Sequence, residues 1–441
     1  MSDSAKSTST IPLFQPKSQT ELRGSFERAY ASQPIETYVE AYDRCGSIFK
    51  IDYHGSQRVA MGGVEANRLI WGDKTLWDYP KTNQHFREQF NDRYLNQLEG
   101  REYVKKRKRV TAGFKPSMLM SHVPAMSAAI ERLVDDLPDG RADLRLLCMR
   151  AIIAMTSRAL MQVDLPTGMD QTMAISNKMM LKGELLGPWR HLYYLRPDRI
   201  YRRQKIFRYL GSIIEQRERD GTEGDDVLSL SLNAHPKDEP PIPRKELVHD
   251  LSQLMMAGST TTSHTILWHL LLTRANPEWE AQIQAELANW SPGNFTNMGD
   301  WPKLKAACLE VERLRPPSML FHRMTARAFD FQGYHIPKGV WVAHLQTLGH
   351  FLPECYEDPL VFKPERFLED SDLPKRDVHG LFGGGAHVCA GFPLARILAP
   401  VAVATLLTHY DIEFETPVET DARVDVMLAP PRPPMVRFRR K

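Results

Sequence analysis

The sequence contains few cysteines, and none of them form a closely spaced pair. Its 441 residues include five and hold no Cys-x-x-Cys motif. The five are Cys45, Cys148, Cys308, Cys355 and Cys389. An odd number of widely spaced cysteines argues against a disulfide framework or a zinc site and favours a reducing compartment. We therefore expect a cytoplasmic protein.

Long apolar runs and an excess of charge are also missing. A strongly apolar stretch such as 266–272 is interrupted by His269 and is too short to span a bilayer. The first ten residues are polar and lack the apolar segment of a secretion signal, so we expect residues 1–20 to form a disordered tail without a membrane anchor. The net charge of +3 says little about binding partners.

The chain as a whole has the composition of a soluble globular protein, with 42% hydrophobic and 25% charged residues. Helical periodicity extends over most of residues 85–315 and returns at 392–409, whereas 47–63 predicts a β-hairpin and 320–345 predicts strands. The best linker candidate, 221–243, is short and interpreted as internal to one domain. We expect a mainly α fold with small β-sheets, forming one domain over residues 21–441.

The most informative segment lies near the C-terminal end, at residues 382–391. It reads Phe-Gly-Gly-Gly-Ala-His-Val-Cys-Ala-Gly and places Cys389 at the end of a glycine-rich loop, two residues after His387. Glycines let a backbone approach a large flat ligand closely, and exposed amides can stabilise a thiolate. Neither common glycine-rich phosphate-binding pattern fits the segment. The alternative is a glycine-rich turn with a buried cysteine.

This segment resembles the haem-binding loop of the cytochrome P450 family, Phe-x-x-Gly-x-[Arg/His]-x-Cys-x-Gly with an alanine four residues later. The positions in register are Phe382, Gly385, His387, Cys389, Gly391 and Ala395. The resemblance covers roughly residues 25–440 and implies the cytochrome P450 fold, with haem b (iron protoporphyrin IX) between a long central helix and the cysteine-bearing loop. It implies that Cys389 is the iron ligand, and a thiolate ligand favours cleavage of the O–O bond.

Further segments match the family. The resemblance implies that Glu310, Arg313 and Arg366, from its Glu-x-x-Arg and Pro-Glu-Arg-Phe elements, form a structural triad of one carboxylate between two guanidinium groups. It also implies four donors to the haem propionates. These are His387, Arg323, Tyr103 and Arg107. Tyr103 stands where the family has Trp or His, and a phenol can still donate one hydrogen bond.

The strongest predicted helix spans Leu247 to about Ala275 and is weakened in its middle by a glycine and a run of hydroxyl residues. The run resembles the family's [Ala/Gly]-Gly-x-[Asp/Glu]-Thr-[Thr/Ser] motif beside the haem. The resemblance implies that Gly258 opens space for dioxygen and that Thr261 delivers protons to it. Thr260 occupies the usual acid position, and a hydroxyl cannot serve as a true acid or base near neutral pH. An altered proton relay, substrate-assisted delivery and a reaction that depends less on protons all remain open, and we favour the first.

Residues 105–109 read Lys-Lys-Arg-Lys-Arg. Such a run can be a solvated helix face, a nucleic-acid patch or a docking surface for an acidic electron donor. No nucleic-acid-binding motif accompanies it, so we expect no nucleic-acid partner. The resemblance favours docking of a ferredoxin, which a separate flavin reductase would supply with electrons.

Substrate contacts are the least readable feature. The resemblance implies a pocket built from residues 75–98, 176–200, 317–322, 426–428 and the centre of the long helix. Those segments supply Trp77, Tyr79, Phe86, Met179, Met180, Leu185, Leu186, Trp189, Met319, Leu320, Phe321 and Met427. Their character predicts an apolar small molecule, such as a fatty acid, a terpenoid or a natural-product intermediate.

The expected activity is therefore that of a soluble, bacterial-type haem-thiolate monooxygenase, which hydroxylates such a molecule with one atom of O₂. A peroxide-driven haem-thiolate peroxygenase is the nearest alternative, although Thr260-Thr261 replaces the Arg-Pro pair that such enzymes tend to carry. A haem-thiolate sensor without enzymatic activity is the other alternative, and it would not need the hydroxyl run after Gly258.

Overall fold

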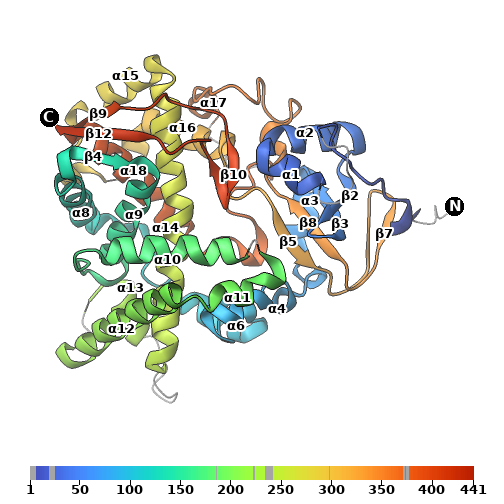
Figure 1. Ribbon diagram of the computed structural model, residues 1–441, viewed down its shortest axis with the longest axis horizontal. Coiled ribbons are helices and arrows are strands. Elements are labelled where there is room, and N and C mark those ends of the chain that lie inside the picture. Colours follow the sequence, from blue (N-terminus) through green and yellow to red (C-terminus); the bar gives the residue numbers. More distant parts are fainter. Residues whose placement is uncertain are drawn as a thin grey trace. The chain divides into compact units, whose positions relative to one another are not determined.

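The computed structural model describes residues 6–18, 25–184, 186–221, 224–233, 242–296, 298–370, 373 and 377–441. The chain forms two compact units (Figure 1). The first unit comprises Met1–Gln84, Leu309–Cys389 and Asp421–Pro431, and the second comprises His85–Cys308, Ala390–Thr420 and Arg432–Lys441. The organisation of residues 21–441 as one haem domain stays a prediction.

The first unit is built around a four-stranded sheet with the order β2-β3-β8-β5. Its strands are β2 (Ile48–Tyr53), β3 (Ser56–Gly62), β8 (Trp341–Leu345) and β5 (Phe321–Met324). Two smaller sheets join β1 (Lys6–Ser7), β7 (Tyr334–Ile336) and β6 (Phe329–Phe331), and pair β10 (Arg423–Asp425) with β11 (Met427–Ala429). The helices are α1 (Ser25–Ser32), α2 (Pro34–Cys45), α3 (Val64–Gly72), α4 (Tyr79–Thr82) and α17 (Arg366–Glu369). Figure 1 shows α1, α2 and α3 beside the larger sheet.

The predicted hairpin is confirmed as β2 and β3. They pair antiparallel from Ile48 opposite Met61 to Tyr53 opposite Ser56, which leaves a two-residue turn. Its residues His54 and Gly55 have φ angles of 51° and 70°. A two-residue turn with both φ values positive matches the twist of the flanking strands.

The N-terminal segment differs from the prediction of a disordered tail over residues 1–20. Lys6 and Ser7 pair in parallel with Tyr334 and His335, and Phe14 is buried in the core of the first unit. Apolar side chains after the polar start explain this order, because burying a residue such as Phe14 stabilises an otherwise polar segment. Residues 1–5 and 19–20 of the predicted tail lie outside the described residues.

The second unit is mostly helical, as the periodicity predicts. Its helices are α5 (Arg87–Phe90), α6 (Gly100–Val110), α7 (Pro116–Ser121), α8 (Val123–Asp135), α9 (Leu144–Met161), α10 (Met169–Glu184), α11 (Arg190–Tyr194), α12 (Pro197–Asp220), α13 (Val227–Asn233), α14 (Arg244–Arg274), α15 (Pro277–Glu286) and α18 (Phe392–His409). A three-stranded sheet joins β4 (Arg141–Asp143), β12 (Met435–Arg440) and β9 (Tyr410–Phe414). Helix α16 (Pro302–Leu314) begins in this unit and continues into the first from Leu309.

Helix α14 is the centre of the second unit. It packs against α9, α12, α18 and α10, and Figure 1 shows α10 and α12 crossing it. Pro243 precedes its first residue and Pro277 follows its end, and proline is tolerated best before or within the first turn of a helix. Helix α18 has the bounds that the sequence predicts. It is long and apolar enough to cross a membrane by those two criteria alone, yet 67% of it is buried in the protein, as for a core helix.

Candidate functional site

The cysteine loop, defined here as residues 380–389, is shaped by its glycines. Gly383 and Gly385 have φ angles of 67° and 64°, which favour glycine. A methyl group on Gly385 would collide with the carbonyl oxygen of Trp71 at the end of α3. The backbone N–H of Cys389 donates to the carbonyl oxygen of Phe382 over 2.9 Å and closes the loop. Cys389 itself is exposed, so the loop presents a thiol rather than burying it.

Two of the four predicted propionate donors meet in the first unit. The ring of His387 stacks on Tyr79, with centroids 3.6 Å apart and planes 17° from parallel. The Arg323 guanidinium lies 5.8 Å from the centre of the Tyr79 ring and donates from Nη1 to the His322 carbonyl oxygen over 2.9 Å. Its Nε is buried and has no hydrogen-bond partner within the part of the chain that the structure describes. Burial lowers the pKa of Arg323, so a nearby anion would stabilise its charge.

The other two predicted donors lie on α6 of the second unit. Arg107 donates from Nη1 to the hydroxyl oxygen of Tyr103 over 2.8 Å. Burial raises the pKa of Tyr103, more than Arg107 lowers it, so the phenol keeps its proton. Tyr103 belongs to a buried cluster against which Leu254 of α14 and Ala390 pack. Ala390 is the residue that follows Cys389, and Gly391 directly precedes the first turn of α18.

The cation-rich run 105–109 is not one surface, which corrects the expectation of a single docking block. Lys106, whose side chain is 2% exposed, lies 2.6 Å from Asp250 and 3.3 Å from Glu246, both on α14. Arg109 makes ion pairs of 2.9 and 2.7 Å with the same two carboxylates. Lys105 and Lys108 are exposed. A helix has 3.6 residues per turn, so residues three apart in the run share a face. Lys106 and Arg109 therefore face the carboxylates of α14, whereas Lys105 and Lys108 face solvent.

The middle of α14 is open on one face, at Gly258. A methyl group on Gly258 would meet no heavy atom within 4 Å. Thr261 donates from Oγ1 to the Ala257 carbonyl oxygen over 3.0 Å, and the Thr260 carbonyl oxygen accepts from Ser263 Oγ at 3.0 Å. Helix packing therefore does not require glycine at position 258, and the hydroxyl of Thr261 bonds within its own helix.

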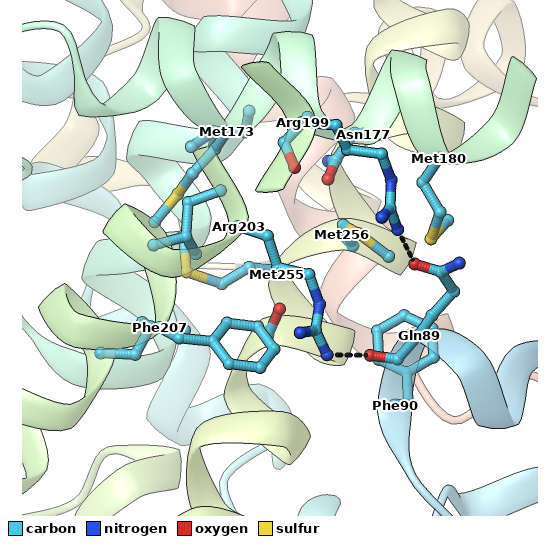
Figure 2. A pocket seen from close by; sticks show the side chains of 15 residues that line it. Gln89, Phe90, Met173, Asn177, Met180, Arg199, Arg203, Phe207, Met255 and Met256 are labelled. Atoms are coloured by element: carbon cyan, nitrogen blue, oxygen red, sulfur yellow. Dashed lines mark hydrogen bonds between the residues drawn. The ribbon is translucent and has the colours of Figure 1, made fainter. Parts of the chain in front are cut away.

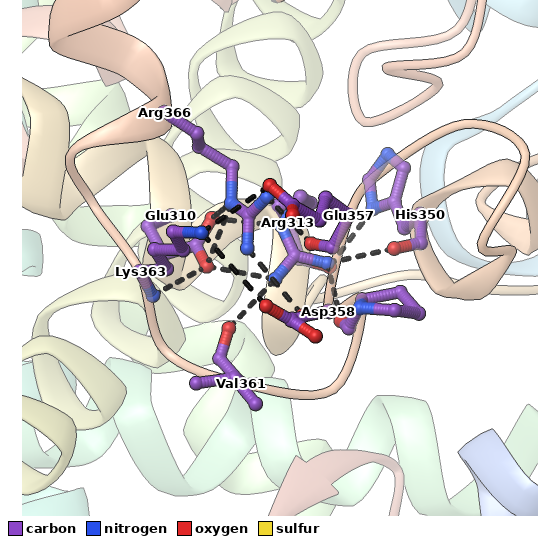
Figure 3. Close-up of polar contacts among 9 residues, drawn as sticks. Glu310, Arg313, His350, Glu357, Asp358, Val361, Lys363 and Arg366 are labelled. Atoms are coloured by element: carbon purple, nitrogen blue, oxygen red, sulfur yellow. Dashed lines mark hydrogen bonds and ion pairs between the residues drawn. The ribbon is translucent and has the colours of Figure 1, made fainter.

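The predicted structural triad is confirmed and is fully built (Figure 3). Glu310 accepts two hydrogen bonds of 2.7 Å from Nε and Nη2 of Arg313, and Arg366 Nε lies 3.3 Å from the same carboxylate. Glu310 and Arg313 are completely buried. Arg313 also donates to the carbonyl oxygens of His350 and Pro359, over 2.7 and 2.6 Å. Such a network fixes the end of α16 against the loops that follow it.

The segments that the sequence assigns to the substrate pocket have several different roles. Trp77 and Met319 are buried in cores of the first unit, whereas Trp189 is 71% exposed. Leu185 lies outside the described residues. A cavity in the second unit takes Gln89, Phe90, Asn177 and Met180 from the predicted segments 75–98 and 176–200 (Figure 2). It also contains Arg199 and Arg203 of α12, which sequence reasoning missed because cations on an amphipathic helix usually face solvent.

Comparison with known proteins agrees with this arrangement. A family model described as Cytochrome P450 matches residues 16–438. The chain is 24% identical to lanosterol 14-alpha demethylase of Bos taurus over 434 residues, which are 94% of this chain and 85% of that protein. It is 31% identical to pentalenene oxygenase of Streptomyces avermitilis over 48% of this chain and 47% of that protein. A solved structure of retinoic acid-bound cyanobacterial CYP120A1 has the same fold, with a TM-score of 0.80 at 20% identity over 99% of this chain and all of that one.

Proposed function

Because the chain belongs to the cytochrome P450 family and is a cytochrome P450 monooxygenase, we propose that it inserts one oxygen atom from O₂ into an apolar molecule of the terpenoid or fatty-acid kind. The observation that supports this proposal best is Cys389, exposed at the end of a loop that matches the family's pattern at every fixed position. Similarity to a pentalenene oxygenase over half of the chain favours a terpenoid.

The family implies a haem-thiolate cofactor, and we propose that it is haem b with Cys389 as the metal ligand. The donor set fits this group, since it combines an exposed thiol with a buried Arg323 Nε that lacks a hydrogen-bond partner within the described chain. Thiolate-ligated haem supplies the activation of dioxygen when bound. Arg323 and His387 would hold propionates from the first unit.

In the second unit, Tyr103 and Arg107 would hold propionates as well. The Arg107–Tyr103 hydrogen bond orients the phenol so that its own proton can be donated. Phe382 anchors the cysteine loop through the carbonyl oxygen that accepts from the Cys389 amide. Gly391 is the residue that directly precedes α18, and we propose it as part of the haem-binding loop.

The residues in the middle of α14 would leave room for O₂ and deliver protons to it. The open volume at Gly258 leaves room for a small molecule such as O₂. Thr261 would have to rotate its hydroxyl away from the Ala257 carbonyl oxygen, 3.0 Å distant, to donate a proton elsewhere. Thr260 can pass a hydrogen bond but cannot supply a charged acid, so protons would reach Thr261 through water or through Thr262.

Electrons would come from a ferredoxin and its flavin reductase. The exposed Lys105 and Lys108, with Arg101 on the same face of α6, would attract an acidic partner. Lys106 and Arg109 would not take part, because they are already paired with Glu246 and Asp250. A cytoplasmic location, supported by the cysteine pattern, completes the proposal.

The decisive experiment is an optical spectrum of the purified protein, reduced and exposed to carbon monoxide. Thiolate ligation predicts the strongly red-shifted Soret band that is characteristic of the family. A Cys389→Ser variant should lose this band while retaining the circular dichroism of the folded protein. The absence of the red-shifted band in the unaltered protein would overturn the proposal.

A further inference from the structure

Two arginines line the cavity of the second unit although its other walls are largely apolar. Arg199 and Arg203 stand one turn apart on α12, and Figure 2 shows both side chains pointing toward Gln89 and Phe90. Arg199 is only 7% exposed. The apolar lining consists mainly of Phe90, Phe207, Met173, Met180, Met255 and Met256. Methionine side chains adapt to irregular ligands, so this lining can rearrange around a flexible apolar group.

Among the described residues, neither arginine forms an ion pair with a carboxylate. Arg199 donates to the Tyr194 carbonyl oxygen over 3.1 Å and to the side-chain oxygen of Gln89, and Arg203 donates to the Gln89 carbonyl oxygen over 3.0 Å. All of these acceptors are neutral. Among the described residues, no carboxylate lies within ion-pair distance of either guanidinium.

Burial lowers the pKa of Arg199 more than the longer-range attraction of the Glu184 and Glu88 carboxylates raises it, and each carboxylate has another partner of its own. Glu88 lies 3.1 Å from Arg190, and Glu184 accepts a hydrogen bond of 2.7 Å from the Tyr194 hydroxyl. The two guanidinium groups rest instead on aromatic rings, Arg199 at 4.0 Å from the centre of Tyr194 and Arg203 at 4.3 Å from that of Phe207. A ring face compensates only part of the cost of burying a cation.

Several other cations of this protein do have carboxylate partners. Lys106 and Arg109 form ion pairs with Asp250 in the same unit. Arg313 forms an ion pair with Glu310 in the first unit. At the cavity, by contrast, two like charges lie four residues apart on one helix, which is destabilising. Burial lowers the pKa of both arginines. Burial together with the charge of Arg203 lowers the pKa of the neighbouring His249 to about 4.

We propose that this cavity binds the carboxylate of an amphiphilic acid, with the anion between Arg199 and Arg203 and the apolar part among the methionines. This inference rests on the proposed function and narrows its substrate class from apolar molecules to apolar carboxylic acids. Only Nη2 of Arg203 makes a hydrogen bond in the described structure, which leaves further N–H groups for a two-point contact with a carboxylate. Met256 precedes Gly258 by two residues, which is roughly 3 Å along the axis of α14 but on a different side of the helix.

Calorimetric titration of the holoenzyme at pH 8 tests the proposal with two matched pairs of probes, decanoate against decan-1-ol and geranic acid against geraniol. A carboxylate is fully ionised at this pH. The unaltered protein should bind each acid at least about tenfold more tightly than its alcohol, which is the effect of a charge-assisted hydrogen bond. Equal affinity for acid and alcohol would overturn the proposal.

Variants separate recognition of the anion from a purely structural role. Arg203→Gln should reduce the acid-to-alcohol affinity ratio to about one, and Arg203→Lys should retain part of it. Arg208→Gln is the matched control, because Arg208 lies on the same helix and is exposed, so the ratio should not change. If Arg203→Gln weakened acid and alcohol equally, the arginine would only tether residues 89–90, and the proposal would fail.

The carbon monoxide spectrum of the same preparations keeps the two conclusions apart. A red-shifted band without acid selectivity would leave the monooxygenase assignment standing and reject the carboxylate site. Acid selectivity without that band would support the carboxylate site and reject the proposed haem-thiolate function.

Discussion

A methyl group added to Gly385 in the cysteine loop would collide with the carbonyl oxygen of Trp71, whereas one added to Gly258 in the middle of α14 would meet no heavy atom within 4 Å. The same residue type is thus required by packing in the first unit and free of packing constraint in the second. The loop must keep one shape to present Cys389, and glycine makes that shape possible. On α14 glycine weakens the helix, and the structure offers no packing reason for it.

The polar groups of the first unit and those in the middle of α14 also differ in how they are hydrogen-bonded. In the first unit the Glu310–Arg313–Arg366 network is buried with its polar groups satisfied. On α14 the hydroxyl of Thr261 bonds only to its own backbone in the described structure. Substitutions in this network or in the cysteine loop should therefore cost folding stability, and substitutions in the middle of α14 should change activity while leaving the fold intact.

The largest stability effect is expected for Glu310→Gln. The substitution leaves two buried guanidinium groups without a full counter-charge, and we expect unfolding to become easier by about 3–5 kcal/mol. Urea unfolding followed by circular dichroism measures this loss. Glu357→Gln is the control, because Glu357 is 82% exposed and its 3.4 Å ion pair with Lys363 should contribute at most about 1 kcal/mol. Similar losses for both variants would contradict a special role of the network.

Gly385→Ala should have the next largest effect. The new methyl group meets backbone rather than a flexible side chain, and the φ angle of 64° disfavours any residue with a Cβ. We expect a loss of at least about 2 kcal/mol together with weaker haem retention. Gly72→Ala provides the control in the same unit, since nothing lies within 4 Å of that position. A Gly385→Ala protein with unchanged melting temperature and haem content would show that the loop is not held by Trp71.

The sequence alone could predict the parts of this picture that depend on local pattern. Periodicity predicted α14 and α18, alternation predicted the β2–β3 hairpin, and fixed motif spacing predicted the Glu310 triad. These features are readable because helices and strands repeat at constant intervals and because a motif at a fixed offset fixes its own geometry.

Long-range pairing explains what the sequence could not predict. Lys106 and Arg109 look like a solvated run until their carboxylate partners on α14, about 140 residues later in the chain, are known. The sequence also gives no sign that the ring of Tyr79 stacks on His387 of the cysteine loop, more than 300 residues later. The cavity arginines Arg199 and Arg203 stand out only because a counter-ion is missing among the described residues, and a missing neighbour leaves no trace in a linear pattern.

Gly258→Ala should change the free energy of unfolding in the opposite direction to Gly385→Ala. Alanine is the better helix former and meets no neighbour, so the free energy of unfolding should rise by about 1 kcal/mol. Turnover should nevertheless fall, because the methyl group fills the space proposed for O₂. Thermal unfolding and substrate oxidation measured on the same preparation check both parts. A variant that is more stable and fully active would show that position 258 does not serve the reaction.

Thr260→Asp should change stability least and is the sharpest test of α14 as a functional region. Position 260 is partly exposed, so a carboxylate can be accommodated, and we expect the free energy of unfolding to stay within about 0.5 kcal/mol. A positioned acid contributes roughly a hundredfold or more to proton transfer, so an acid beside Thr261 should lower the share of electrons lost as hydrogen peroxide. Thr260→Asn is the matched control, because it has the shape of aspartate without a titratable proton. If both variants matched the unaltered protein in turnover and peroxide release, the hydroxyl at this position would be irrelevant to proton delivery. If aspartate alone reduced peroxide release, the chain would be shown to work with a proton relay weaker than the one that its family's motif usually provides.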